Sequence, residues 1–165
     1  MQSTPPNPPP TEAAEPVLDP AIRVMLLPRD TNAHGTIFGG VILSYIDLAG
    51  AIGAHRFGIG PMVTVAMNGV TFHEPVFVGD VLSLYSHPVR LGRTSITMRI
   101  RVEAERALMK HGVSAPNRVT VTEARVTYVA VDEHRRPTPI ENLRPQIEAA
   151  IQAHARQHQP ASASE

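Results

Sequence analysis

The residue whose type and position most clearly indicate chemistry is Asp47. It is the only acidic residue in the segment 39–57, where nearly all other side chains are apolar. Burying a carboxylate costs free energy unless it is hydrogen-bonded or its pKa rises, so a buried Asp47 would be a candidate general base or nucleophile. The same pattern also fits an aspartate on the one exposed stripe of a helix, or one that caps a neighbouring strand.

Two consecutive glycines, Gly39 and Gly40, precede Asp47 at the start of the same segment. The first N–H groups of a helix have no acceptor within the helix, and the helix dipole favours negative charge there. A glycine pair lets a ligand approach such N–H groups, which can stabilise an oxyanion during acyl transfer. A tight turn with close packing explains the pair as well, so the glycines alone do not decide between these interpretations.

The segment 39–57 must position these groups, and it is apolar on nearly every side, which is typical of a buried helix of about five turns. A short apolar run at 22–27 comes before it. Strand-like segments follow at 62–72, 80–90, 94–105 and 119–131. In the third of these, apolar and polar residues alternate strictly, as expected of a strand with one buried face. The order predicts an α+β hotdog fold, with one long central helix wrapped by a curved antiparallel sheet.

The composition excludes several classes of protein. Lys and Arg number 15, as do Asp and Glu, so no net charge favours nucleic acid or an anionic membrane as a partner. The chain has no cysteine, which rules out disulfides, thiolate metal sites and a cysteine nucleophile. The histidines show no metal-ligand spacing, so we expect no metal site. The apolar stretch 41–54 is too short to cross a bilayer.

The ends of the chain differ from its middle. Residues 1–20 hold seven of the sixteen prolines, which predicts a disordered arm. They contain no Lys or Arg and no apolar run like that of a secretory signal, so we expect a cytoplasmic protein. Residues 21–140 form the single expected domain. Residues 141–165 are expected to hold a short helix, from 145 to 157, followed by a disordered tail.

An ordered set of motifs resembles one known family. The set comprises DTNAHGTIFGG at 30–40, Asp47, VTVAMNGVTF at 63–72, Pro75-Val76 with Val78-Gly79-Asp80, Gly92-Arg93-Thr94-Ser95, and TYVAVD at 127–132. In this order the motifs resemble the YciA-type acyl-CoA thioester hydrolases over about residues 22–140. The resemblance implies hydrolysis of acyl-CoA to a free acid and CoA, with no cofactor beyond the CoA of substrate and product. It also implies homodimers that assemble into larger oligomers, commonly hexameric trimers of dimers.

The resemblance assigns roles to individual residues. Asp47 corresponds to the catalytic carboxylate, which acts as a general base on water or as a nucleophile. Asn32 corresponds to the residue that orients the water or polarises the thioester. The N–H of Gly40, with that of Gly39, would hold the oxyanion. The other expected substrate contacts are Phe38, Thr64, Thr94, Ser95 and Arg93, the last as a phosphate partner.

Helix geometry adds a prediction about the assembly. Gly40 and Asp47 are separated by roughly 10 Å along a helix axis, at 1.5 Å per residue. The donors and the base must each lie within about 3 Å of the reacting atoms. One helix cannot easily supply both, so we expect Asp47 of one subunit to act with Asn32 and Gly40 of its partner.

The sequence leaves two alternatives to a thioesterase. One is a non-catalytic hotdog protein that binds acyl-CoA as a sensor or interaction partner, although such a binder has little use for a buried carboxylate. The other is a thioester dehydratase or hydratase, which would need a catalytic histidine near the helix start, where only His34 lies. His34, His73 and Glu74 depart from the family pattern; they leave the catalytic pair intact and bear on acyl preference and CoA affinity.

Overall fold

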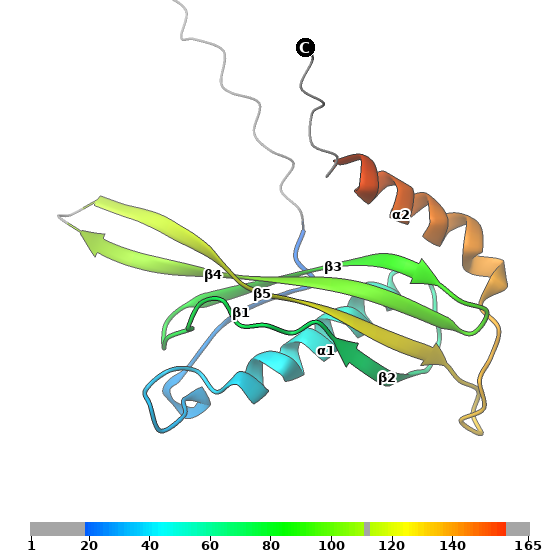
Figure 1. Ribbon diagram of the computed structural model, residues 1–165, viewed down its shortest axis with the longest axis horizontal. Helices are drawn as coiled ribbons and strands as arrows, with labels where there is room; N and C mark the ends of the chain where they lie inside the picture. The colour runs from blue at the N-terminus through cyan, green and yellow to red at the C-terminus, as the bar shows by residue number, and fades with distance from the viewer. Residues whose placement is uncertain (1–18, 111–112, 158–165) are drawn as a thin grey trace, which may run out of the picture.

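The protein is built on one five-stranded antiparallel sheet (Figure 1). The computed structural model describes residues 19–110 and 113–157. Across the sheet the strand order is β1-β3-β4-β5-β2, which places β2 at one edge. The strands are β1 (Ile22–Met25), β2 (Met62–Asn68), β3 (Val81–Leu91), β4 (Ser95–Lys110) and β5 (Val113–Ala130).

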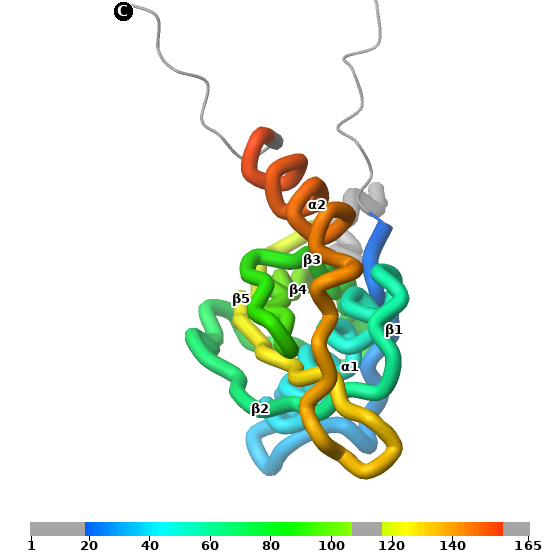
Figure 2. The backbone as a smooth tube through the Cα atoms, turned by 90° about the vertical axis from the view of Figure 1, so that its right-hand side faces the viewer, coloured from blue at the N-terminus to red at the C-terminus, as the bar shows by residue number. Residues whose placement is uncertain are grey.

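Helix α1 (Gly39–His55) lies in the concave side of this sheet. Viewed end on, the strands form an arc around it (Figure 2). Its sheet-facing residues are fully buried, Ile46 and Ala49 among them. The expected helix start at Gly39 is confirmed, and the helix ends two residues before the expected 57 because the chain turns at Phe57, whose N–H bonds Ala54 O.

Two glycines let α1 approach the sheet closely. A Cβ at Gly50 would lie 2.1 Å from the Tyr128 hydroxyl, and one at Gly53 would lie 2.3 Å from Ser86 Oγ. Side chains at these positions would force the helix and sheet apart. The glycines therefore set the helix-to-sheet distance, although they weaken the helix intrinsically.

The expected alternation in β4 is confirmed, and it divides the sheet into a core face and an outer face. The inward side chains of β4 are almost wholly buried: Ile96, Met98, Ile100, Val102 and Ala104. Between them, Arg99 and Arg101 point away from α1 and keep their charges in contact with solvent. Burial of these apolar side chains against α1 is the main favourable contribution to the free energy of folding in this layer.

Strands β4 and β5 run further than the sequence indicates. The expected ends at 105 and 119 were wrong, since the two strands stay paired as far as Lys110 and Val113. β3 stops contributing at the Val81–Glu105 pair, so the outer part of the hairpin has no third strand beside it (Figure 1). Pairing between the two strands alone maintains the extension, and apolar alternation does not report such pairing.

A second helix, α2 (Arg144–Gln157), packs outside the arc against β3 (Figure 2). It begins one residue before the expected 145. Ile147 is fully buried at this contact, and the His154 ring stacks on His87 of β3 at 3.4 Å. Helices therefore pack against both sides of the sheet; the sequence predicted one long central helix and a separate short C-terminal helix, but not the packing of the latter against β3. Short 3₁₀ turns lie at Pro28–Asp30 and Glu141–Leu143.

The domain boundaries at 20, 21, 140 and 141 stay predictions. Most of the 1–20 arm and the tail beyond 157 lie outside the described residues. Within the described part of the chain, no helix is both long and apolar enough to span a membrane.

Candidate active site

Asp47 lies half-buried on α1, facing the edge strand β2. The Thr64 hydroxyl donates a hydrogen bond of 2.7 Å to Asp47 Oδ1. A carboxylate held in this way has a fixed orientation on an otherwise apolar helix. Of the site residues expected from the sequence, the structure brings these two into direct contact.

A β-bulge lies directly after Thr64 in β2. The pairing of β2 with β5 shifts register between Thr64 and Ala66, so Val65 has no partner on β5. Bulges bend a strand and redirect its side chains, and they are common beside active sites. Here the bulge follows directly on the residue that holds the carboxylate.

Tyr128 is the residue of this site that sequence reasoning missed. It lies opposite Thr64 in the β2–β5 pair, is almost fully buried, and donates a hydrogen bond of 2.6 Å to the backbone carbonyl of Asp47. Thr64 and Tyr128 therefore hold the side chain and the main chain of Asp47 respectively. The available signal was a tyrosine in a strand of small and β-branched residues, because a buried tyrosine hydroxyl usually requires a partner.

The Tyr128 phenol is held in its neutral, donating form. Burial raises its pKa well above the ordinary value of 10.0, and the negative charge of Asp47 raises it further. The hydroxyl therefore keeps its proton throughout the neutral range. The bond to the Asp47 carbonyl is correspondingly insensitive to pH there.

Asn32 lies in the loop before α1, where its side chain orders the chain locally. Its Oδ1 accepts from the N–H of His34 at 2.8 Å and from that of Thr36 at 3.4 Å, and its Nδ2 donates to Thr36 Oγ1 at 2.9 Å. A carboxamide has two N–H donors, so one remains beyond those bonds. No hydrogen bond joins Asn32 to Asp47 within the described subunit.

The start of α1 presents backbone N–H groups, as expected. Phe38 is the N-cap residue, and no side chain caps the helix there. The Phe38 ring lies over Gly40, since a Cβ at Gly40 would meet it at 2.3 Å, and Phe38 as a residue is 57% exposed. Gly40 thus faces the ring of Phe38, and Gly39 faces the ring of Phe72, which a Cβ at Gly39 would meet at 3.5 Å.

The residues expected to contact CoA lie in the turn between β3 and β4. The carbonyls of Arg93 and Thr94 accept hydrogen bonds of 2.9 Å from the N–H groups of Ile140 and Ala130. The Ser95 carbonyl accepts from Gly92 at 2.8 Å. The turn is thus fixed by backbone bonds, which leaves the exposed Arg93 side chain directed to solvent. Among the residues the structure describes, no hydrogen bond or ion pair connects Arg93 with Asp47.

A cavity of about 210 Å³ opens beside the start of α1. Ile37, Ile42 and Val76 form its buried floor, and Gly39 belongs to its wall. The exposed side chains of Phe72 and Glu74 stand at its rim. A cavity with an apolar floor beside the first backbone N–H groups of a helix is suited to an acyl group attached to a carbonyl.

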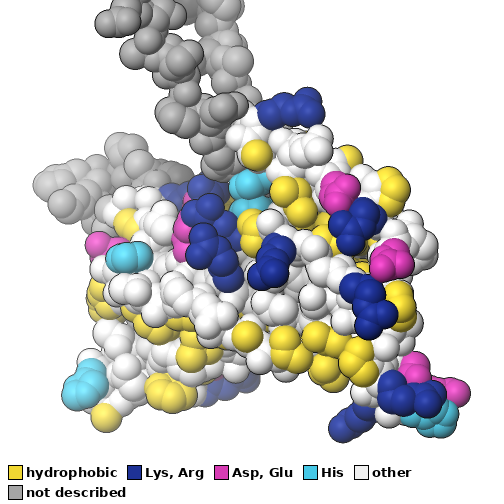
Figure 3. All heavy atoms as spheres, turned by 45° about the vertical axis from the view of Figure 1, so that its right-hand side comes forward, with side chains coloured by type: hydrophobic (Ala, Val, Ile, Leu, Met, Phe, Trp, Pro, Cys, Tyr) yellow, Lys and Arg dark blue, Asp and Glu magenta, His cyan; other side chains and the backbone are white. Residues whose placement is uncertain are grey.

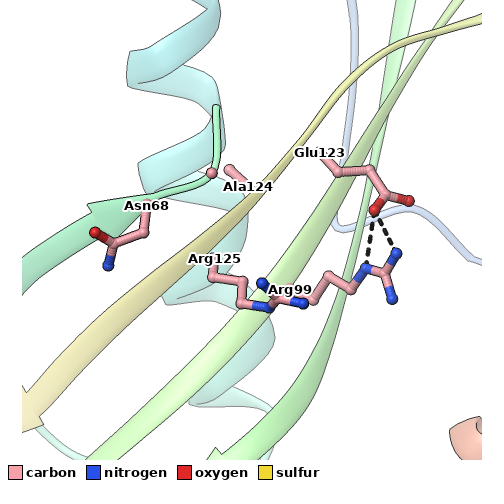
Figure 4. Close-up of a pocket in the computed structure, with 6 residues that line it drawn as sticks. Asn68, Arg99, Glu123, Ala124 and Arg125 are labelled. Carbon is pink, nitrogen blue, oxygen red and sulfur yellow. Dashed lines mark hydrogen bonds and ion pairs between the residues drawn. The ribbon is translucent and has the colours of Figure 1, made fainter. Parts of the chain in front are cut away.

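A second, smaller hollow of about 80 Å³ lies on the outer face of the sheet (Figure 4). Arg99 pairs with Glu123 through two guanidinium nitrogens, and Arg125 stands directly opposite Arg99 across the β4–β5 pair. Asn68 contributes from the edge strand. None of the residues expected to perform acyl transfer lines this hollow, so it is not the candidate active site.

Comparisons with known proteins agree with this geometry. Residues 34–107 match the family model of the thioesterase superfamily. A hexameric hotdog fold thioesterase of Campylobacter jejuni superimposes with a TM-score of 0.73 at 42% identity, covering 78% of this chain and 96% of that one. A hexameric broad specificity acyl-coenzyme A thioesterase gives a TM-score of 0.70 at 35% identity, covering 81% and 90%. The fold and site therefore define a hotdog thioesterase.

Curated relatives narrow the class. The acyl-CoA thioester hydrolase YciA of Salmonella typhimurium is 43% identical over 121 residues, which cover 72% of this chain and 87% of the relative. YciA of Escherichia coli K12 is 42% identical over a stretch covering 72% and 88%. The chain belongs to the YciA-type acyl-CoA thioester hydrolases, and it is an enzyme of this class.

Proposed function

We propose that this hydrolase uses Asp47 as its catalytic carboxylate, held by Thr64 on one subunit and completed by Asn32 and Gly40 of a second subunit. The observation that carries the proposal is the Thr64–Asp47 hydrogen bond of 2.7 Å. A carboxylate that is oriented by a strand residue on an apolar helix has the preorganisation that a general base or a nucleophile requires.

The reaction can follow either of two routes. As a general base, Asp47 takes a proton from water while the water oxygen attacks the thioester carbonyl carbon; the C–S bond then breaks and the proton passes to the leaving CoA thiolate. As a nucleophile, Asp47 forms an acyl anhydride with release of CoA thiolate, and water then hydrolyses that anhydride. In both routes the Gly40 N–H, with that of Gly39, stabilises the negative carbonyl oxygen. We propose no metal or other cofactor in either route.

The surface around Asp47 supports a shared site. β2 is an edge strand, and an edge presents unpaired backbone donors and acceptors to another chain. Beside it, apolar side chains of α1 and β2 are exposed, including Leu48 at 52% and Val65 at 54%. Figure 3 shows hydrophobic side chains gathered along the lower part of the molecule, where β2 lies in Figure 1. Pairing of two subunits through this surface would cover it.

The distance along α1 supplies the reason for pairing. Asp47 and Gly40 remain roughly 10 Å apart along the helix axis, so a second helix is needed to bring N–H donors to the reacting carbonyl. We propose a dimer that brings the partner's helix start to Asp47, and assembly of such dimers into a hexamer, the state of the similar thioesterases. A cytoplasmic location remains part of this proposal.

Thr64→Val is expected to lower kcat by roughly 10- to 100-fold, because an unheld carboxylate loses its attack geometry. Thr64→Ser keeps the hydroxyl and should retain most of the rate. The KM for acyl-CoA should change little in either variant, since Thr64 is proposed to act through Asp47. A Thr64→Val enzyme as fast as Thr64→Ser would show that this bond has no part in positioning the carboxylate.

The proposed function is tested by measuring release of free CoA thiol from short, long and aromatic acyl-CoA thioesters. Since the chain has no cysteine, a thiol reagent reports product only. Turnover that depends on Asp47 supports the proposed site. Binding of CoA without any turnover would instead favour the acyl-CoA sensor and leave Asp47 a structural residue.

A further inference from the structure

We propose that the cavity beside the start of α1 binds the acyl group of the substrate, and that Glu74 at its rim excludes acyl groups that end in a carboxylate. The inference rests on the proposed function, because it assumes that the thioester carbonyl lies at the first N–H groups of α1. It adds a substrate preference that catalysis by Asp47 does not specify.

The cavity lies where the acyl chain would leave the carbonyl. Gly39 forms part of its wall, and Gly40, the proposed oxyanion donor, is the next residue in the helix. The floor is apolar and buried, with Ile37 at 5% and Ile42 and Val76 each at 2% exposure. At about 210 Å³ it is smaller than the roughly 300–1,000 Å³ of pockets that hold drug-sized ligands. Its size and lining suit a short acyl chain.

Fixed backbone contacts hold the walls of this cavity in place. The Ile37 N–H donates to the Val76 carbonyl at 2.8 Å, which joins the loop before α1 to the loop before β3. Arg106 donates to the Pro75 carbonyl and pairs with the buried Asp80 at 3.2 Å. Pro75 and Val76, the two residues after Glu74, are therefore anchored, which fixes the backbone on that side of the rim.

Among the residues that the structure describes, Glu74 is the only charged one that lines the cavity. No ion pair joins it to a cation among the residues the structure describes, and Arg106 is already engaged by Asp80 and the Pro75 carbonyl. A second carboxylate, at the end of an acyl chain in this cavity, would meet an uncompensated like charge, whereas a neutral chain would not.

Butyryl-CoA and succinyl-CoA provide the test, since both acyl groups have four carbons and the succinyl group carries a carboxylate in place of the terminal methyl group of the butyryl group. The ratio of their kcat/KM values is measured for wild type, Glu74→Gln and Glu133→Gln. Glu133 is an exposed glutamate in the turn after β5 and does not line the cavity. We expect wild type to prefer butyryl-CoA, and Glu74→Gln to reduce this preference by about tenfold or more through faster succinyl-CoA hydrolysis. Butyryl-CoA hydrolysis should stay within about twofold, and Glu133→Gln should resemble wild type.

Salt gives an independent measurement on the same proteins. High salt screens exposed charges. It should therefore reduce the preference for butyryl-CoA over succinyl-CoA in wild type and in Glu133→Gln, but not in Glu74→Gln. Comparing the two thioesters removes effects of salt on the CoA portion, which they share.

The possible failures are distinguishable. An unchanged butyryl-to-succinyl ratio in an active Glu74→Gln enzyme would overturn the inference and leave the catalytic proposal standing. Absence of hydrolysis of any acyl-CoA by wild type would overturn the proposed function and this inference together.

Discussion

Asp47→Asn is expected to lower kcat for acyl-CoA hydrolysis by about 100- to 10,000-fold, the usual contribution of a positioned acid–base group. The amide has nearly the same shape as the carboxylate and can still accept the Thr64 hydrogen bond of 2.7 Å. It can neither take a proton from water nor attack the carbonyl. The loss would therefore report chemistry rather than a change of fold.

Release of CoA thiol, the melting temperature and CoA binding should be measured together for this variant. We expect the melting temperature and CoA binding to remain close to those of wild type. Asp132→Asn is a matched control, because it makes the same change from carboxylate to amide outside the candidate site. The Asp132 carboxylate accepts the N–H groups of His134 and Arg136. The control should keep full activity. An Asp47→Asn enzyme that retains most of its rate would contradict the proposed mechanism.

Gly50→Ala is expected to have the largest effect on stability among conservative changes in α1. The new Cβ would lie 2.1 Å from the Tyr128 hydroxyl and 2.9 Å from Cζ of the same ring, which is almost fully buried and cannot move aside. Alanine favours the helix by about 1 kcal/mol, but overpacking in a tight core costs about 1–3 kcal/mol and occasionally more. Displacing Tyr128 also breaks its bond to the Asp47 carbonyl.

We therefore expect Gly50→Ala to lower the free energy of unfolding by about 2 kcal/mol, and to reduce kcat as well. Urea denaturation monitored by circular dichroism measures the first effect, and thiol release measures the second. Gly60→Ala is the control, since nothing lies within 4 Å of its new Cβ. Equal stability of the two variants would show that α1 does not depend on close approach at Gly50.

The sequence predicts the fold well where periodicity reflects burial. The alternation from Ile96 to Ala104 correctly separates the two faces of β4, and the glycines at the start of α1 mark where that helix begins. The outer half of the β4–β5 hairpin is missed because strand-to-strand pairing, not a buried face, maintains it. Periodicity carries no signal for such a ribbon.

The sequence singles out Asp47 and Thr64 as candidate site residues, but it predicts neither Tyr128 nor the contacts among the three. Asp47 stands out as the one carboxylate of an apolar helix, yet its contact with Thr64 depends on where β2 lies beside β5 in the sheet. The same pairing places Tyr128 beneath the Asp47 carbonyl. These contacts join segments far apart in the sequence, so no local pattern could reveal them.

The roles of Asn32 and of the Arg93-Thr94-Ser95 turn stay predictions. Within one subunit the Asn32 carboxamide orders its own loop, and the turn lies at the far end of β4 from the hairpin tip. Both assignments depend on what a second subunit brings to the site. The roles of these residues therefore depend on how the subunits are arranged.

Mixing Asp47→Ala with Asn32→Ala subunits tests the shared site most directly. Each variant alone should be nearly inactive. In a confirmed mixed dimer, one of the two sites regains an intact Asp47 from one subunit and an intact Asn32 from the other, so activity should recover to about half that of wild type. Mixed dimers that remain as inactive as their parents would contradict the account and place each site within a single subunit.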